Sequence, residues 1–243
     1  MLSTFLGMNS IQRIIGDFRV SNNITLTNFS GLNSLVDIED RFVVSDNDMI
    51  SNFNGLQNLE FIGDNFELTR NENLTSLEGL DNLSSIDGTL VVRSNQRLKN
   101  MKGLEFLNTI TEGLSLLDCE IATLEGLDNV RNLGHLLISP ANNLSNLSGL
   151  EGLERVVDFR INGNGSLLSL TGLGLTTITG DLNIQGTNIR TLGGLEALIR
   201  VQGELHLDRN NDLETIGSLS NLEILDGNLF IQSTAISLSL IHI

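Results

Sequence analysis

A Gly-Leu step recurs along the chain at a nearly constant spacing, and this repeat limits the possible folds more than any other feature. Successive steps lie 22 to 24 residues apart. The series, with Gly-Met at its first position and Ser-Leu at its last, starts at Gly7, Gly31, Gly55, Gly79, Gly103, Gly126, Gly149, Gly172, Gly194 and Ser218. A unit of this length cannot bury its own apolar side chains, so we expect successive units to stack against one another.

Each unit carries apolar residues at fixed distances from the glycine, namely five and two residues before it and seven after it. A short alternating segment follows, as in Leu205-His206-Leu207, and then a turn rich in Asn, Asp and Gly. Alternation with a period of two predicts a strand with one buried face. Strands of successive units would pair in parallel, about 4.8 Å apart, and each apolar position would form a ladder of like side chains.

The pattern predicts a mainly β fold: a right-handed parallel β-solenoid of about ten coils, each of 22–24 residues. We expect one continuous solenoid over residues 1–236, followed by an apolar tail over 237–243 that departs from the repeat. The first coil fits the repeat, so we do not expect it to be a signal peptide. Because a solenoid normally needs capping units, we hypothesise that the chain is a fragment of a longer surface protein.

Charge and cysteine content argue against several classes of protein. Thirty acidic residues against fourteen basic ones give a net charge of −16, whereas nucleic-acid binders are normally basic because phosphate contacts dominate their affinity. Cys119 is the single cysteine and cannot form an internal disulfide. The sequence also lacks the run of about 18 apolar residues that a membrane span needs. We therefore expect no nucleic-acid partner and no membrane insertion by this segment.

One unit, residues 83–104, gives a clear copy of the repeat. Its defining residues are Leu83, Ile86, Gly88, Leu90, Val92, Asn95, Leu98, Met101, Gly103 and Leu104. The unit resembles the receptor L domain, a leucine-rich-repeat-like β-helix of cell-surface proteins. An inserted x-Gly-x after the Ile, as at Gly88, distinguishes it from ordinary leucine-rich repeats. The resemblance implies an extracellular or cell-surface glycoprotein, not an enzyme, that binds a protein or carbohydrate ligand. Receptor L domains have fewer coils and cysteine-containing ends, so no ligand contact can be transferred to this chain.

The outward centre of each predicted strand varies on an otherwise regular scaffold. These positions are Arg19, Val43, Glu67, Val91, Leu137, Arg160, Asn183, His206 and Phe230, with Ser115 between Val91 and Leu137. Such variation is typical of a recognition surface and also of an unselected one. The exposed apolar members favour contact with a partner, and we predict that this open sheet face binds the ligand.

An asparagine column follows the predicted strands. It contains Asn23, Asn47, Asn71, Asn95, Asn164 and Asn210, and we place its interruptions at Asp118, Ala141 and Gly186. One interpretation is a polar or Ca²⁺-binding edge, although the Gly-Gly-x-Gly-x-Asp motif of calcium-binding β-rolls is absent. The interpretation we favour is structural, because Asn tolerates the left-handed conformation and hydrogen-bonds its own backbone.

A second polar column stands three residues before each glycine. It begins at Thr4 and continues with Asn28, Asn52, Ser76, Asn100, Thr123, Asn146, Ser169, Thr191 and Thr215. A structural account gives each side chain a hydrogen bond to the backbone of its tight corner. The functional alternative is a flat face that binds ice or a polysaccharide surface.

Residues that could carry chemistry lack the partners that chemistry requires. Cys119 has no His or acid in a nucleophile pattern, and we expect a free thiol in a corner. His135 and His206 lie on outward strand positions without a metal-ligand spacing. Asp158, Asp181 and Glu204 fall in one outward column, which this acidic chain can produce by chance. We predict no catalytic residue, no metal site and no cofactor.

Seven Asn-x-Ser/Thr sequons are candidates for glycosylation. They start at Asn23, Asn28, Asn73, Asn82, Asn143, Asn146 and Asn164, a small excess over chance that does not establish secretion. The main alternative to a recognition module is a structural or adhesive spacer, in which the rod sets a distance and no single site matters.

Overall fold

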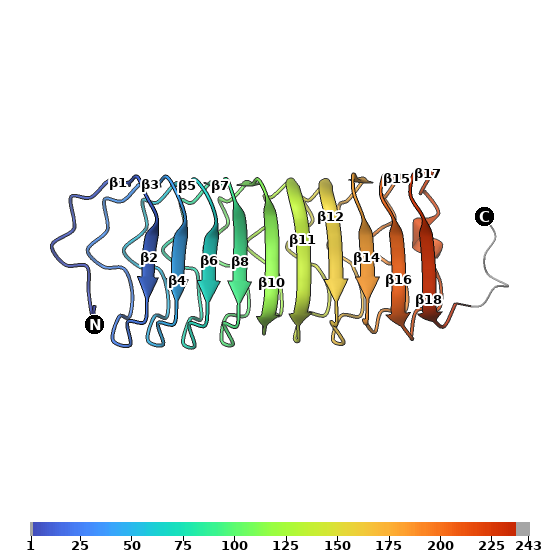
Figure 1. The fold of residues 1–243 in the computed structure, drawn as a ribbon, viewed down its shortest axis with the longest axis horizontal. Coiled ribbons are helices and arrows are strands. Elements are labelled where there is room, and N and C mark those ends of the chain that lie inside the picture. Colours follow the sequence, from blue (N-terminus) through green and yellow to red (C-terminus); the bar gives the residue numbers. More distant parts are fainter. Residues whose placement is uncertain (1, 237–243) are drawn as a thin grey trace.

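The computed structural model describes residues 2–236; Met1 and the tail expected at 237–243 lie outside the described residues. Short strands and turns make up almost all of this range and wind into a single solenoid (Figure 1). The only helical element in the described range is the 3₁₀ turn η1, Gly217–Leu219. The predicted mainly β, parallel solenoid is confirmed.

Ten longer strands, one from each coil, form the main sheet, and every pairing between them is parallel. Their bounds are β2 Phe18–Ser21, β4 Phe42–Ser45, β6 Phe66–Thr69, β8 Thr89–Arg93, β10 Gly113–Cys119, β11 Asn132–Ala141, β12 Arg155–Asn162, β14 Leu182–Gln185, β16 Leu205–Asn210 and β18 Leu229–Thr234. About nine turns of the solenoid connect these ten strands. In Figure 1 they run downward at the front while the chain advances to the right, which is a right-handed coil.

Two-residue strands precede most of the main strands, on the other side of a corner. The first five are β1 Arg13–Ile14, β3 Asp37–Ile38, β5 Phe61–Ile62, β7 Ser85–Ile86 and β9 Thr109–Ile110, and they form a sheet of their own. The last three are β13 Thr177–Ile178, β15 Arg200–Val201 and β17 Ile224–Leu225. β13 pairs with the first residues of β12, β15 pairs with β13, and β17 pairs with β15.

The repeated glycine occupies a corner where only glycine fits. From Gly7 to Gly194 its φ lies between +102° and +113°, a region that residues with a side chain rarely adopt. Successive coils also approach closely here: a Cβ added to Gly126 would overlap the carbonyl group of Met101 in the preceding coil. The positive φ and the close approach together explain why glycine marks each coil.

The core is a continuous set of side-chain ladders, mostly of Leu, Ile and Val. The aromatic residues are concentrated in the first coils, where they stack on like neighbours. One column is Phe5, Phe29 and Phe53, with ring centroids 5.7 and 5.1 Å apart. A second is Phe18, Phe42 and Phe66, at 5.0 and 4.9 Å. The two columns meet edge to face at 5.8–6.4 Å, a favourable geometry for aromatic pairs.

Two coils in the middle of the rod lack one residue at the corner before the main strand. Three residues separate Ile86 from Leu90, but only two separate Leu133 from Leu136. The shortened corner no longer divides the strand, so β11 and β12 run through it as strands of 10 and 8 residues. The first small sheet ends at β9, which does not pair with β11.

We expect Gly126→Ala to destabilise the fold by about 1–3 kcal/mol, because it combines an unfavourable φ with a clash against the preceding coil. Urea denaturation followed by circular dichroism measures the effect. Gly165→Ala is the matched control, since φ there is not in the positive range and a Cβ has room. Equal denaturation midpoints for the two variants would contradict the assignment of the corner.

Candidate functional site

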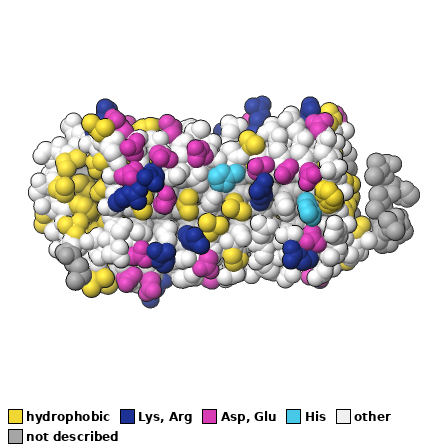
Figure 2. Space-filling model, in the orientation of Figure 1, with side chains coloured by type: hydrophobic (Ala, Val, Ile, Leu, Met, Phe, Trp, Pro, Cys, Tyr) yellow, Lys and Arg dark blue, Asp and Glu magenta, His cyan; other side chains and the backbone are white. Residues whose placement is uncertain are grey.

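The strand register places the expected binding-face residues in one continuous row across the outer face of the main sheet (Figure 2). The paired positions run from Arg19 opposite Val43 to His206 opposite Phe230. This centre row comprises Arg19, Val43, Glu67, Val91, Ser115, Leu137, Arg160, Asn183, His206 and Phe230. Each coil thus brings its centre residue beside that of the next coil, 22 to 24 positions along the sequence.

Exposure varies along the centre row. Arg19 and Arg160 are exposed, and Val91 and Leu137 are half-buried. Val43, in contrast, is only 8% exposed. Our expectation of an exposed apolar side chain at Val43 is wrong, because it lies between the longer side chains of Arg19 and Glu67 in the row.

An apolar patch occupies the middle of the sheet face. It consists of Val91 and Leu137 from the centre row and Leu117 from the adjacent outward row, all half-buried around the small side chain of Ser115. Our sequence analysis missed Leu117. The alternation could have indicated it: in Leu114-Ser115-Leu116-Leu117 the next outward position after Ser115 is Leu117, which is apolar like Val91 and Leu137.

A cluster of ion pairs lies on the N-terminal side of this patch. Asp17 accepts hydrogen bonds from Arg19 Nη2 at 2.7 Å and from Arg41 Nη2 at 3.0 Å. These bonds, the one from Arg19 foremost, lower the pKa of the Asp17 carboxyl below its usual value. All three side chains are at least a quarter exposed, so the cluster is a solvated, charged border of the sheet face.

Acidic side chains follow the patch on its C-terminal side. Asp158 Oδ1 accepts the amide of Asp181 at 3.0 Å, and Asp181 Oδ1 accepts the amide of Glu204 at 2.9 Å. Arg160 Nη2 lies 3.7 Å from a carboxylate oxygen of both Asp158 and Asp181. These acids therefore bind the backbone at the corners of successive coils. Among residues 2–236 no three metal-binding side chains are grouped so that they could hold an ion.

The two outward histidines have neighbours that the sequence did not indicate. His135 Nε2 lies 2.9 Å from Ser115 Oγ, beside Gly113, where a Cβ would overlap the imidazole. The ring of His206 lies against that of Phe230, with centroids 5.3 Å apart. Both histidines thus belong to the sheet face.

The asparagine column lies inside the solenoid and joins one coil to the next. Asn71 is typical: its Nδ2 donates to the carbonyl of Val44 at 2.9 Å, and its Oδ1 accepts the amide of Asn47 at 3.2 Å. The amide of Asn71 donates in turn to Asn95 Oδ1 at 2.9 Å. Asn71 is fully buried. The column is structural, as we favoured, but our expectation that the Asn itself adopts the left-handed conformation is wrong.

The left-handed conformation belongs to the residue before each of these asparagines. Positive φ is found at Asn22, Asp46, Arg70 and Arg209, while the following Asn spans coils with its side chain. The register also corrects two interruptions of the column. One interruption is Cys119, which pairs with Ala141, and not Asp118 as we expected. The other is Thr187, whose amide donates to Asn210 Oδ1, and not Gly186.

Cys119 therefore replaces a ladder asparagine. Its thiol is buried, and burial raises its pKa to about 11. The thiol stays protonated at neutral pH, and a protonated thiol is a poor nucleophile.

The second polar column closes the corner before each glycine. In every coil but that of Thr123, the side chain accepts a hydrogen bond from the backbone amide two residues on, as Asn52 Oδ1 does from Asn54 at 3.0 Å. Within the described chain no such bond is present at Thr123. These acceptors are engaged with the protein itself, as the structural account requires.

A third set of side chains, which the sequence analysis missed, caps the repeated glycine. Asp81, Glu105, Asp128, Glu151 and Glu196 each stand two residues after the glycine and accept its backbone amide at 2.7–3.0 Å. Part of the negative charge of the chain therefore has a structural role at the corners.

The seven sequons differ in accessibility. Asn82 and Asn143 are exposed, and Asn23, Asn28, Asn73 and Asn146 are half-buried. Asn164 is fully buried, and its Nδ2 donates to the carbonyls of Ile138 and Asn162. A glycan at Asn164 is incompatible with this fold, which corrects that part of the prediction.

Comparisons with protein-family models, with curated proteins and with solved structures found no match to this chain. The described residues include no helix long and apolar enough to cross a bilayer.

We expect Asn71→Ala to lower the free energy of unfolding by roughly 2–4 kcal/mol, because it leaves the buried carbonyl of Val44 and the buried amide of Asn47 without partners. Chemical denaturation measures the change. The control, Asn211→Ala, removes an exposed asparagine from a turn. A loss no larger than that of the control would show that the ladder does not stabilise the coils.

In folded protein secreted from a eukaryotic host, we expect glycan at Asn82 or Asn143 and none at Asn164. The exposed amides can carry a glycan, whereas the Asn164 amide is held inside the solenoid. Mass spectrometry of peptides after enzymatic deglycosylation identifies the modified positions. Glycan at Asn164 in a cooperatively folded sample would contradict the burial of this side chain.

Proposed function

We propose that this protein is a non-enzymatic recognition module of the cell surface or the extracellular space, related to receptor L domains. The observation that carries the proposal is the apolar patch of Val91, Leu117 and Leu137. These side chains lie on the outer face of the sheet and are not part of the solenoid core. An apolar centre bordered by charged groups is the usual anatomy of a protein interface, so the proposed ligand is a protein, with a glycan as the alternative.

The scaffold supports this role because it holds the face in a fixed register. Every strand below the patch is paired on both sides, and the outward residues vary in polarity while the inward residues of these strands stay apolar. Solenoids present extended surfaces of this kind to their partners. The cell-surface location and the relationship to L domains rest on the repeat motif.

A structural spacer is the second candidate, and one observation favours it. The hydrophobic core and the sheet continue without interruption from the first coil to the last, which makes a rod suited to setting a distance. A surface binder that uses the Asn, Ser and Thr column is less well supported, because nearly all of those side chains already bind their own corner.

Screening the protein against arrays of extracellular proteins and of glycans tests the proposal, with Leu137→Asp as the diagnostic variant. A charge in the middle of the patch should weaken a genuine interaction by about tenfold or more, because centrally buried contacts dominate binding energy. The control is Leu168→Asp, which places the same charge at a 61% exposed leucine outside the main sheet.

Binding that Leu137→Asp abolishes and Leu168→Asp preserves would support recognition through the sheet face. Binding that neither variant changes would place the interface elsewhere. If neither array yields a binder, the spacer becomes the better account.

A further inference from the structure

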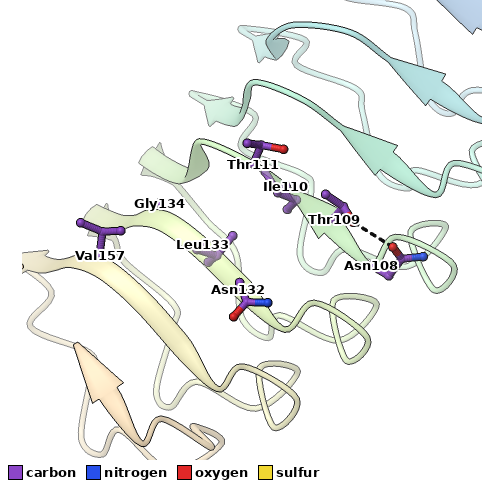
Figure 3. A pocket seen from close by; sticks show the side chains of 8 residues that line it. All are labelled: Asn108, Thr109, Ile110, Thr111, Asn132, Leu133, Gly134 and Val157. Atoms are coloured by element: carbon purple, nitrogen blue, oxygen red, sulfur yellow. Dashed lines mark hydrogen bonds between the residues drawn. The ribbon is translucent and has the colours of Figure 1, made fainter. Parts of the chain in front are cut away.

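A groove of about 380 Å³ lies at the joint between β9 and β11, away from the centre row (Figure 3). Its lining residues come from three successive coils. They are Asn108, Thr109, Ile110, Thr111, Asn132, Leu133, Gly134 and Val157. Ligand sites begin at about 300 Å³, so the groove has room for one small ligand or one residue of a chain.

The groove exists because the shortened corner of the sixth coil interrupts the backbone pairing. At the preceding joint, the amide of Asn108 donates to Ser84 at 3.1 Å and that of Thr111 donates to Ile86 at 3.0 Å. The same two bonds recur at earlier joints, for example Ser84 to Glu60 and Asp87 to Ile62.

The corresponding bonds are missing between β9 and β11. In the described structure, the amide of Arg131 does not donate to the carbonyl of Asn108, and β9 does not pair with β11. The regular pairing resumes at His135, whose amide donates to the carbonyl of Glu112 at 2.8 Å. The amide of Arg131 and the carbonyl of Asn108 are therefore available to a ligand, and a ligand that covers them must pair them, because unpaired backbone groups are costly when they are buried.

The lining matches a neutral ligand rich in hydroxyl groups. Asn108, Thr109 and Asn132 supply amide and hydroxyl groups on both sides, and Thr109 Oγ1 already donates to Asn108 Oδ1 at 2.9 Å. Val157, which is 46% exposed, supplies the accessible apolar surface, whereas Ile110 and Leu133 are buried in the core beneath the groove. None of the lining side chains is charged, although the chain carries a net charge of −16. An ionic ligand would find no counter-charge in the groove.

An extended peptide strand does not fit this joint. A strand inserted between two others needs them to be about 9.6 Å apart, twice the usual strand spacing. Cα atoms of β9 and β11 lie within 8 Å of one another, and pairing between adjacent strands β10 and β11 resumes at Gly113 and His135. The joint therefore has open hydrogen-bonding groups but no room for a strand.

We propose that this groove binds a neutral sugar residue, with hydroxyl groups on the open backbone and on the Asn and Thr side chains, and the apolar ring face against Val157. The site is separate from the sheet-face interface and does not depend on it.

Backbone amide shifts in a ¹⁵N-labelled sample test the proposal, with glucose, galactose, mannose and N-acetylglucosamine as millimolar probes and sialic acid as a charged one. We expect at least one neutral sugar to shift the amides of 108–111 and 131–134 and not those of the sheet face. Thr109→Val should weaken that binding by about fivefold, as the loss of one hydrogen bond predicts. Ser85→Ala, at the equivalent position of the intact preceding joint, should leave it unchanged.

Several outcomes would overturn the proposal: no shift at these amides with any neutral sugar, equal shifts with sialic acid, or binding that Thr109→Val and Ser85→Ala affect alike. Shifts produced by an extended peptide and not by sugars would also overturn it. None of these results bears on the sheet face, whose test uses Leu137→Asp.

Discussion

The transfer of hydrogen bonds from coil to coil by buried asparagine side chains is the interaction on which this rod depends. A β-sheet pairs its own backbone, but a turn that closes a coil leaves amides and carbonyls pointing into a dry interior, which is costly. Asn47, Asn71, Asn164 and Asn210 meet this need, because each side chain donates to a carbonyl of the preceding coil and accepts an amide of that coil. The left-handed residue before each Asn turns the chain, and the repeated glycine brings the next corner close enough to continue the stack.

The repeat alone was sufficient to predict the fold, because each column of the sequence is a ladder in the structure. It was less informative where the coil length changes. Counting from the glycine placed two interruptions of the asparagine column one residue too early, at Asp118 and Gly186 instead of Cys119 and Thr187. The true positions follow from strand pairing and hydrogen bonds between coils, and not from a constant spacing. The sequence also could not show that Val43 is covered, or that the shortened corner at Gly134 opens a groove, because both depend on side chains and backbone of neighbouring coils.

The division between inward constancy and outward variation links the fold to the proposed function. The inward apolar residues and the buried ladder asparagines stack the coils, and acids such as Asp128 close the glycine corners within a coil. Two surfaces are not used in this way. One is the sheet face, with an apolar patch between two charged borders, and the other is the groove where the backbone pairing between β9 and β11 is interrupted. A solenoid can change these outward residues without disturbing the ladders beneath them, which is why such a scaffold suits recognition.

Hydrogen exchange measured by NMR tests the central role of the asparagine ladder most directly. The amides of Asn47, Asn71 and Thr187 lie outside the strands yet donate to ladder side chains, so they should exchange as slowly as amides of the main strands. Exchange as fast as that of the exposed turn at Asn211 would contradict the account.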